Sequence, residues 1–315
     1  MMEVQFSSEN IHYSTASREV SPGDYPKSLG RIVNNTTVSF LRKHIDYTMA
    51  KGSDADRSVP LEQRGEAAER TVHDRVKPKA VKALRELLDP NKPICFVPVA
   101  GIESAALNFL PTAYADMLAD QLGGEVWIDI CKNKGSANTD KALNKRLTNQ
   151  QQFEGPVPPA DTQIIIVDDV TTAGDTFTTL IDYLMKNDRI PVAATTLALS
   201  RYTANLKTPE EEIKKLLGKA EVSSVEFEYE LGYPTKHITG QEARAYILSG
   251  KPGRNGLKAF FPKVLLPGKA EPISPEENQN AADSKPFSQK YYQLREQLHQ
   301  GYAGILKAKA KRKAN

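Results

Sequence analysis

Two adjacent carboxylates, followed by a run of hydroxyl-bearing and small residues, are the part of this sequence best suited to chemistry. Asp168 and Asp169 come directly after an apolar stretch, and the run that follows contains Thr171, Thr172, Ala173, Gly174, Asp175 and Thr176. A helix that starts in such a run offers unpaired N–H groups to an anion, and glycine lets the backbone approach a phosphate closely. Carboxylates at a strand end suit ribose hydroxyls, directly or through Mg²⁺. The pattern therefore indicates a site for a phosphorylated sugar.

The residues on either side of this run predict the elements that position it. Ile164–Val167 is a β-branched apolar run typical of a buried strand. Apolar residues then recur at helical spacing, at Phe177, Leu180, Ile181 and Leu184. An ordinary buried strand whose acids cap the next helix is the alternative. A Walker-type nucleotide site is excluded, because no G-x-x-x-x-G-K-[ST] pattern occurs.

The run VDDVTTAGDT resembles the phosphoribosyl-diphosphate (PRPP) motif of the type I phosphoribosyltransferases. The resemblance implies that Asp168 and Asp169 hold the ribose hydroxyls and meet Mg²⁺ only indirectly, through ribose or water. It also implies that Thr171–Thr176 bind the 5-phosphate. One residue departs from the family pattern: Asp175 places a carboxylate inside the phosphate loop. We expect its side chain to point away from the anion, where it stabilises the start of the helix.

Two segments before this motif resemble other parts of the same family. A strand predicted at 94–99 is followed by Ala100 and Gly101, which in the family would contact the diphosphate; a plain turn is the alternative. Residues 132–159 form a long polar segment, which resembles the family's mobile catalytic loop. Lys132 and Lys134 are its catalytic candidates, and a solvated linker is the alternative. Residues 141–153 also resemble the competence protein F branch.

A further pair of candidate substrate-binding residues follows the strand predicted at 191–199. Arg201 and Tyr202 would meet the diphosphate and stack on a base, because ligands bind beyond the carboxyl ends of parallel strands. An ordinary surface pair is the alternative.

Alternating strands and helices predict an α/β fold with a parallel-sheet, phosphoribosyltransferase-like (Rossmann-like) core. Helices are expected at 32–49, 60–74, 78–88, 112–122, 208–217 and 239–248, and strands at 126–131 and 222–231. The domain organisation that we expect is a mainly helical N-terminal extension at 1–90, the phosphoribosyltransferase-like domain at 91–250, a Pro/Gly-rich linker at 251–286, and a basic amphipathic helix at 287–315.

The composition of the chain indicates the cellular environment of the protein. No apolar run approaches the ~18 residues of a membrane span, and the first residues lack a secretory signal, so we expect a cytoplasmic protein with no membrane contact. Cys95 and Cys131 are expected to be buried free thiols rather than a disulfide. The last nine residues carry five positive charges and no acid. This tail suggests a weak nucleic-acid contact or a solubilising end.

The resemblance to the type I phosphoribosyltransferases implies a Mg²⁺-dependent glycosyltransferase that moves a phosphoribosyl group from PRPP to a nucleobase or related nitrogen acceptor. We also expect a homo-oligomer. Three alternatives remain open: a non-catalytic PRPP sensor, an accessory protein in nucleic-acid handling, and an enzyme acting on a related ribosyl phosphate.

Overall fold

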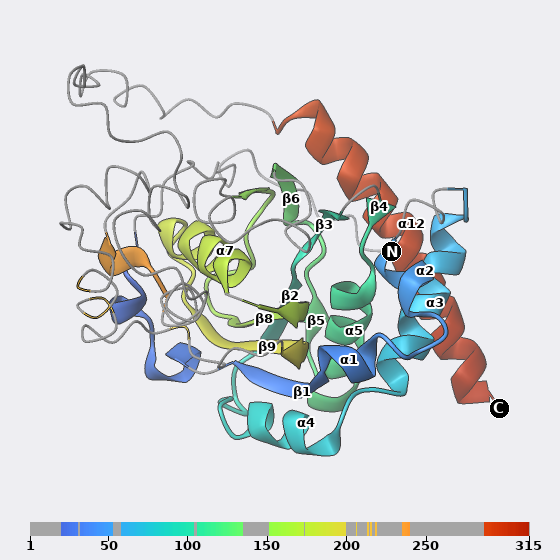
Figure 1. The fold of residues 1–315 in the computed structure, drawn as a ribbon, viewed down its shortest axis with the longest axis horizontal. Coiled ribbons are helices and arrows are strands. Elements are labelled where there is room, and N and C mark those ends of the chain that lie inside the picture. Colours follow the sequence, from blue (N-terminus) through green and yellow to red (C-terminus); the bar gives the residue numbers. More distant parts are fainter. Residues whose placement is uncertain are drawn as a thin grey trace.

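The computed structural model describes residues 20–30, 32–52, 58–103, 106–134, 151–172, 174–199, 206, 213, 215, 218, 235–239 and 287–314 (Figure 1). The predicted strand at 222–231, the linker at 251–286 and nearly all of the helices predicted at 208–217 and 239–248 lie outside these ranges. Within the described part of the chain, no helix is long and apolar enough to cross a membrane.

A five-stranded parallel sheet organises the fold, with β8 (Gln163–Thr171) at its centre. Its strand order is β1-β9-β8-β2-β5, and every neighbouring pair is parallel. The other members are β1 (Val33–Thr37), β9 (Pro191–Leu199), β2 (Ile94–Pro98) and β5 (Glu125–Val126). The apolar run at 164–167 is at most 1% exposed, as a strand covered on both faces requires. The α/β class and the strands predicted around 94–99, 164–167 and 191–199 are confirmed.

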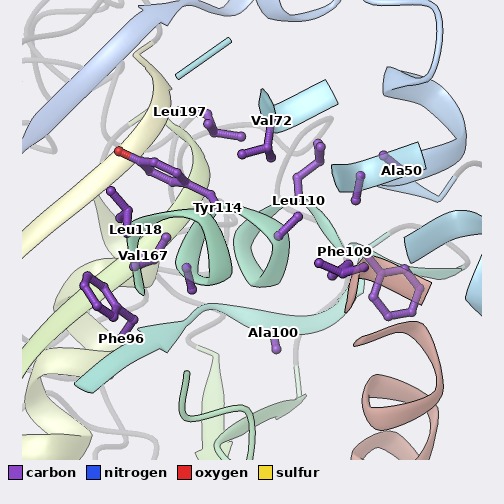
Figure 2. Close-up of a cluster of buried hydrophobic side chains, with 14 of the residues drawn as sticks. Ala50, Val72, Phe96, Ala100, Phe109, Leu110, Tyr114, Leu118, Val167 and Leu197 are labelled. Atoms are coloured by element: carbon purple, nitrogen blue, oxygen red, sulfur yellow. The ribbon is translucent and has the colours of Figure 1, made fainter. Parts of the chain in front are cut away.

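Helices cover both faces of this sheet. On one face α5 (Leu110–Leu122) packs over Ile165 and Val167, and Figure 2 shows this apolar cluster. On the other face α7 (Asp175–Lys186) packs over Ile164 and Ile166. The alternation follows the period of two along a strand, and it fixes which face each later residue of β8 occupies.

A buried tyrosine ties α5 to the sheet. The hydroxyl of Tyr114 lies 2.7 Å from Asn35 Nδ2 in β1 and 2.8 Å from Thr195 Oγ1 in β9. Burial raises the pKa of Tyr114 to about 12, so the group stays a neutral hydroxyl that needs such partners. The contact connects a segment near the N-terminus to the centre of the fold.

The helix predicted at 32–49 is wrong in its first part. Residues 33–37 form β1, which pairs in parallel with β9, and only short helices follow: α1 (Val38–Leu41) and α2 (Tyr47–Lys51). This strand is rich in Asn and Thr, so local apolar spacing did not reveal it. Helices α3 (Leu61–His73) and α4 (Pro78–Arg85) confirm the predictions at 60–74 and 78–88.

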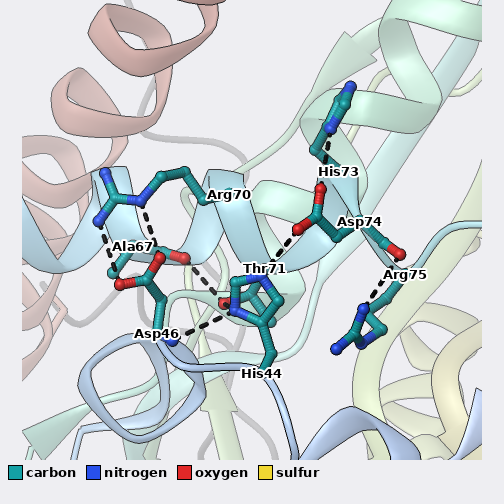
Figure 3. Close-up of polar contacts among 8 residues, drawn as sticks. All are labelled: His44, Asp46, Ala67, Arg70, Thr71, His73, Asp74 and Arg75. Atoms are coloured by element: carbon teal, nitrogen blue, oxygen red, sulfur yellow. Dashed lines mark hydrogen bonds and ion pairs between the residues drawn. The ribbon is translucent and has the colours of Figure 1, made fainter.

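Polar contacts fasten the turn before α2 onto α3 (Figure 3). Arg70 Nε donates to Asp46 Oδ2 at 2.8 Å. His44 contacts Thr71 Oγ1 through Nδ1 at 3.1 Å and Asp74 Oδ2 through Nε2 at 3.0 Å. These contacts fix the start of α2, and α2 carries a residue of the candidate site.

A second, four-stranded sheet of order β4-β3-β6-β7 stands beside the first. It contains β3 (Ala100–Glu103), β4 (Ala106–Leu107), β6 (Cys131–Lys134) and β7 (Gln152–Glu154). Residues 100–103 are therefore a strand, which corrects the plain turn considered for Ala100 and Gly101. The strand predicted at 126–131 is divided between the two sheets, because Trp127 turns the chain: its N–H donates to Phe96 O and its indole to Pro156 O.

The C-terminal helix α12 (Gln289–Ala314) confirms the helix predicted at 287–315 and packs closely on α3. Glycines make this approach possible: a Cβ at Gly65 would overlap the carbonyl of Gly301, and one at Gly304 would overlap that of Glu62. Tyr291, Leu294, Leu298 and Ile305 are buried, whereas Leu306 remains 41% exposed.

The basic end of α12 is part of the fold. Acids of α3 and α5 pair with all five of its cations; the pairs are Lys307 with Glu62, Lys311 with Glu66, Arg312 with Glu69, Lys309 with Asp116, and Lys313 with Asp120. The positive charge seen in the sequence is therefore largely balanced within the molecule.

Three short 3-10 helices complete the described chain: η2 (Pro22–Asp24), η3 (Lys27–Gly30) and η5 (Thr235–His237). Ser21 Oγ donates to Lys236 O at 3.1 Å and so joins the first of them to the last.

Candidate functional site

The candidate site lies where β8 ends and the chain turns into α7, at the carboxyl edge of the parallel sheet. Gly174 precedes the helix with a φ of 88°, a left-handed conformation that favours glycine. Its carbonyl accepts hydrogen bonds from Thr178 N at 2.9 Å and Thr178 Oγ1 at 3.0 Å. The helix therefore starts at once after the turn, with its N–H groups directed toward the edge of the sheet.

The acidic pair is divided between the two faces of the sheet. Alternation along β8 puts Asp169 on the face of Ile165 and Val167, and Asp168 on the opposite face. The two residues are nevertheless linked, because Asp169 N donates to Asp168 Oδ1 at 2.8 Å. Their exposed fractions are 6% for Asp168 and 1% for Asp169.

Lys51 forms an ion pair with Asp169. Its Nζ lies 2.6 Å from Asp169 Oδ2, and the two side chains are 18% and 2% exposed. Sequence analysis missed this lysine, because the two residues are 118 positions apart and Lys51 stands in an otherwise ordinary polar stretch. Tyr47, one turn earlier in α2, is also buried nearby, and burial raises its pKa.

Thr171 is the most informative hydroxyl of the predicted phosphate loop. It is 3% exposed, and its Oγ1 has no hydrogen-bond partner among the residues that the structure describes. A buried polar atom without a partner is costly in a native fold, so this hydroxyl is poised for a ligand or water. Thr172 and Thr176 are half-buried.

Asp175 is only 9% exposed, at the first position of α7. That its side chain points away from a bound anion stays a prediction. Thr179 Oγ1 donates to its carbonyl at 2.9 Å, which holds the first turn. A carboxylate at a helix N-terminus interacts favourably with the helix dipole, and this one does so while buried.

The segment after β2 brings further candidates together. Ala100 pairs with Cys131 and Gly101 with Lys132 across β3 and β6. A Cβ at Gly101 would lie 2.7 Å from Lys132 Cβ, so the lysine side chain passes directly over the glycine. Lys132 is only 6% exposed and belongs to a strand, which corrects its predicted place in a solvent-facing loop.

The remaining predicted residues are less fully placed. Lys134 is the last residue of β6. Residues 135–150 of the predicted catalytic loop lie outside the described residues, as do Ala173, Arg201 and Tyr202. Its end corrects the prediction, because β7 (Gln152–Glu154) is a strand there.

The described residues fit Mg²⁺ only as an ion held largely by ligand oxygens and water. No group of three or more His, Cys, Asp or Glu side chains among them could hold a metal. Asp169 is already paired with Lys51. Mg²⁺ keeps several waters and commonly binds through one or two carboxylates together with substrate phosphates, which agrees with an indirect role for Asp168 and Asp169.

Both predicted free thiols are confirmed. Cys95 and Cys131 are buried and not bonded to each other. Burial raises the pKa of both thiols, that of Cys95 to about 12, so neither cysteine has the character of a catalytic thiolate.

Comparison with known proteins finds partial relatives and no matching family model. The chain is 34% identical over 186 residues to Protein TraN of Escherichia coli, an alignment that covers 59% of this chain and 38% of that protein. It is 32% identical over 121 residues to an uncharacterised protein of Haemophilus influenzae, with 38% of this chain and 27% of that protein covered. The chain thus spans well under half the length of either relative.

Proposed function

We propose that this chain binds PRPP together with Mg²⁺ at the β8–α7 turn, on a phosphoribosyltransferase-like core, and transfers the phosphoribosyl group to a nitrogen acceptor such as a nucleobase. The observation that carries the proposal is the buried Oγ1 of Thr171, which has no partner among the described residues and ends the strand that leads into the N-terminus of α7. Both features suit an anion. The fold supports the location, because ligands of open α/β sheets bind outside the carboxyl ends of the strands.

The proposed binding mode assigns one part of the ligand to each part of the site. The 5-phosphate would receive hydrogen bonds from Thr171, Thr176 and the first N–H groups of α7. Asp168 would bind the ribose hydroxyls, and Asp169 would contribute charge from the other face of the sheet. The diphosphate would lie toward Gly101 and Lys132, which the structure brings together.

In this account the chain's own groups act by positioning and charge. As the bond from the ribosyl carbon to diphosphate breaks and the bond to the acceptor nitrogen forms, positive charge develops on the ribose ring. The carboxylates of Asp168 and Asp169 stabilise that charge, and buried groups act more strongly than exposed ones. Mg²⁺, when bound, would neutralise charge on the diphosphate.

A second candidate is a PRPP-binding protein without turnover. The ion pair between Lys51 and Asp169 favours it, because it engages one of the two acids that the transfer reaction requires. The accessory nucleic-acid role has less support than the sequence suggested, since acids of α3 and α5 already pair with the basic end of α12. The names of the two relatives state no ligand and so favour neither candidate.

One experiment separates these candidates. Calorimetry with PRPP and Mg²⁺ tests binding, and release of diphosphate is then measured against a panel of nucleobases. Binding with release supports the enzyme, binding alone supports the sensor, and an absence of binding contradicts both.

Asp168→Asn should abolish diphosphate release, because it removes the carboxylate assigned to the ribose. Asp161→Asn, at an exposed position just before β8, is the matched control and should leave release unchanged. Equal release by the Asp168 variant and the wild type would remove Asp168 from the mechanism.

A further inference from the structure

We propose that Lys51 is the resident cation of the acidic site, and that it adapts the site to a polyanionic sugar phosphate in preference to a bare divalent cation. The inference rests on the proposed function, which it deepens by naming a residue that selects the ligand. Its starting point is the 2.6 Å contact between Lys51 Nζ and the almost completely buried carboxylate of Asp169.

The lysine is held in place by its surroundings. Ala50 O accepts a hydrogen bond from Phe109 N at 3.1 Å, which fastens the end of α2 to the chain entering α5. Gly52 ends the helix with a φ of 83°, and a Cβ there would lie 2.7 Å from Leu107 O. The start of α2 is bound to α3 through Asp46 and Arg70 (Figure 3). Lys51 is therefore presented to Asp169 by packed backbone on both sides.

The positive charge of Lys51 affects which ligands the site can bind. Asp168, Asp169 and Asp175 put three buried carboxylates around the turn where a phosphate is expected to bind. Like charges in a poorly solvated region repel more strongly than they do in water. Lys51 neutralises the most buried of the three, and the buried Lys132 supplies a second positive charge near Gly101. Together the two lysines reduce the electrostatic repulsion between the site and a polyanion.

The same lysine acts against a divalent cation. A metal ion that approaches Asp169 must displace an ammonium group 2.6 Å away and overcome its repulsion. Removing the charge of Lys51 therefore has opposite effects on two ligands: a polyanion binds more weakly, and a bare cation binds more tightly. A purely structural role would not change the two affinities in opposite directions.

The test uses the full chain and two probes, PRPP with Mg²⁺ by calorimetry and Mn²⁺ alone by electron paramagnetic resonance. Lys51→Met should weaken PRPP binding at least about tenfold, equivalent to about 1.4 kcal/mol, and should tighten Mn²⁺ binding by a similar factor. Lys186→Met is the matched control, because Lys186 is 19% exposed and pairs at 3.0 Å with the buried Asp182 at the far end of α7. It should change neither affinity.

Two further variants test whether the charge of Lys51 and the carboxylate of Asp169 are responsible for these effects. Lys51→Arg retains the charge, so it should keep the wild-type affinity for both probes. The double variant Lys51→Met with Asp169→Asn should lose the gain in Mn²⁺ affinity, because the freed carboxylate is gone. If Lys51→Met fails to fold, wild-type Mn²⁺ affinity in Lys51→Arg supports the inference, and a changed affinity overturns it.

The two proposals fail in different ways. If wild-type protein does not bind PRPP, the proposed function is wrong, and the Mn²⁺ measurements still decide the role of Lys51. If Lys51→Met binds PRPP as tightly as the wild type, or Mn²⁺ no more tightly, the inference about Lys51 is overturned even where PRPP binding stands.

Discussion

Lys309 Nζ lies 2.6 Å from Asp116 Oδ2 and 3.1 Å from Asp120 Oδ1, so the last turns of α12 are fastened to α5, the helix that covers one face of the parallel sheet. Tyr302 donates to the same Asp116 carboxylate at 3.0 Å. The C-terminal helix is thus bound to the layer that supports β8. A truncation that removes residues 307–315 is therefore expected to affect the fold.

Lys309→Met should lower the free energy of unfolding by about 3 kcal/mol, because it leaves the Asp116 carboxylate buried without its cation. The Asp116 side chain is only 5% exposed. Lys311→Met is the matched control, since Lys311 is 61% exposed and should contribute less than about 1 kcal/mol. Urea denaturation measures both. Equal values for the two variants would contradict a structural role for the Lys309 pair.

Gly65→Ala should destabilise the protein by about 1–3 kcal/mol, because the new Cβ would overlap the carbonyl of Gly301 and force α3 and α12 apart. Gly218→Ala is the control: it is a helical glycine with no atom within 4 Å of the added Cβ. Thermal unfolding compares the two. A Gly65→Ala protein as stable as the wild type would show that the two helices are less closely packed than described.

Acid should weaken the attachment of α12 at its other end. Burial of Asp129 opposes its ionisation, but hydrogen bonds from His299 and Arg295 outweigh it and hold the pKa of Asp129 below its ordinary value. A lowered folded-state pKa contributes stability that is full above the ordinary value of 3.8 and is lost as pH falls through the folded-state value.

Asp129→Asn should therefore destabilise the protein at neutral pH and reduce the loss of stability on acidification. Denaturant unfolding at neutral pH and at acidic pH measures this difference. If wild type and variant lose the same stability on acidification, Asp129 is not the group responsible.

Local patterns in the sequence were sufficient to predict the secondary structure at the centre of the fold. Residues 163–184 were predicted as strand, turn and helix. The β-branched run indicates the strand, and the apolar residues at helical spacing that follow indicate the helix, without any information from distant residues. Elements that depend on pairing between distant residues could not be predicted from such patterns. Residues 33–37 form a strand because they pair with β9, about 160 positions away, and not because of their own apolar content.

In the candidate site, too, the local features could be predicted from the sequence and the long-range ones could not. The turn that follows Thr171 and contains Gly174 could be predicted from residue types alone. The separation of Asp168 and Asp169 onto opposite faces required the strand to continue through both residues, to Thr171. Lys51 could not be found at all, because its position depends on how α2 packs against α3 and against the chain entering α5.

Binding of the PRPP phosphate at the β8–α7 turn can be tested with Thr171→Val. This change removes a buried hydroxyl that has no partner among the described residues, so it should not destabilise the fold. Thr112→Val on α5 is the matched control, because Thr112 Oγ1 is equally buried and without a partner there. Calorimetric titration of PRPP with Mg²⁺ into both variants should give at least about a tenfold loss of affinity for Thr171→Val and wild-type affinity for Thr112→Val. Wild-type affinity in both variants would contradict phosphate binding at this turn.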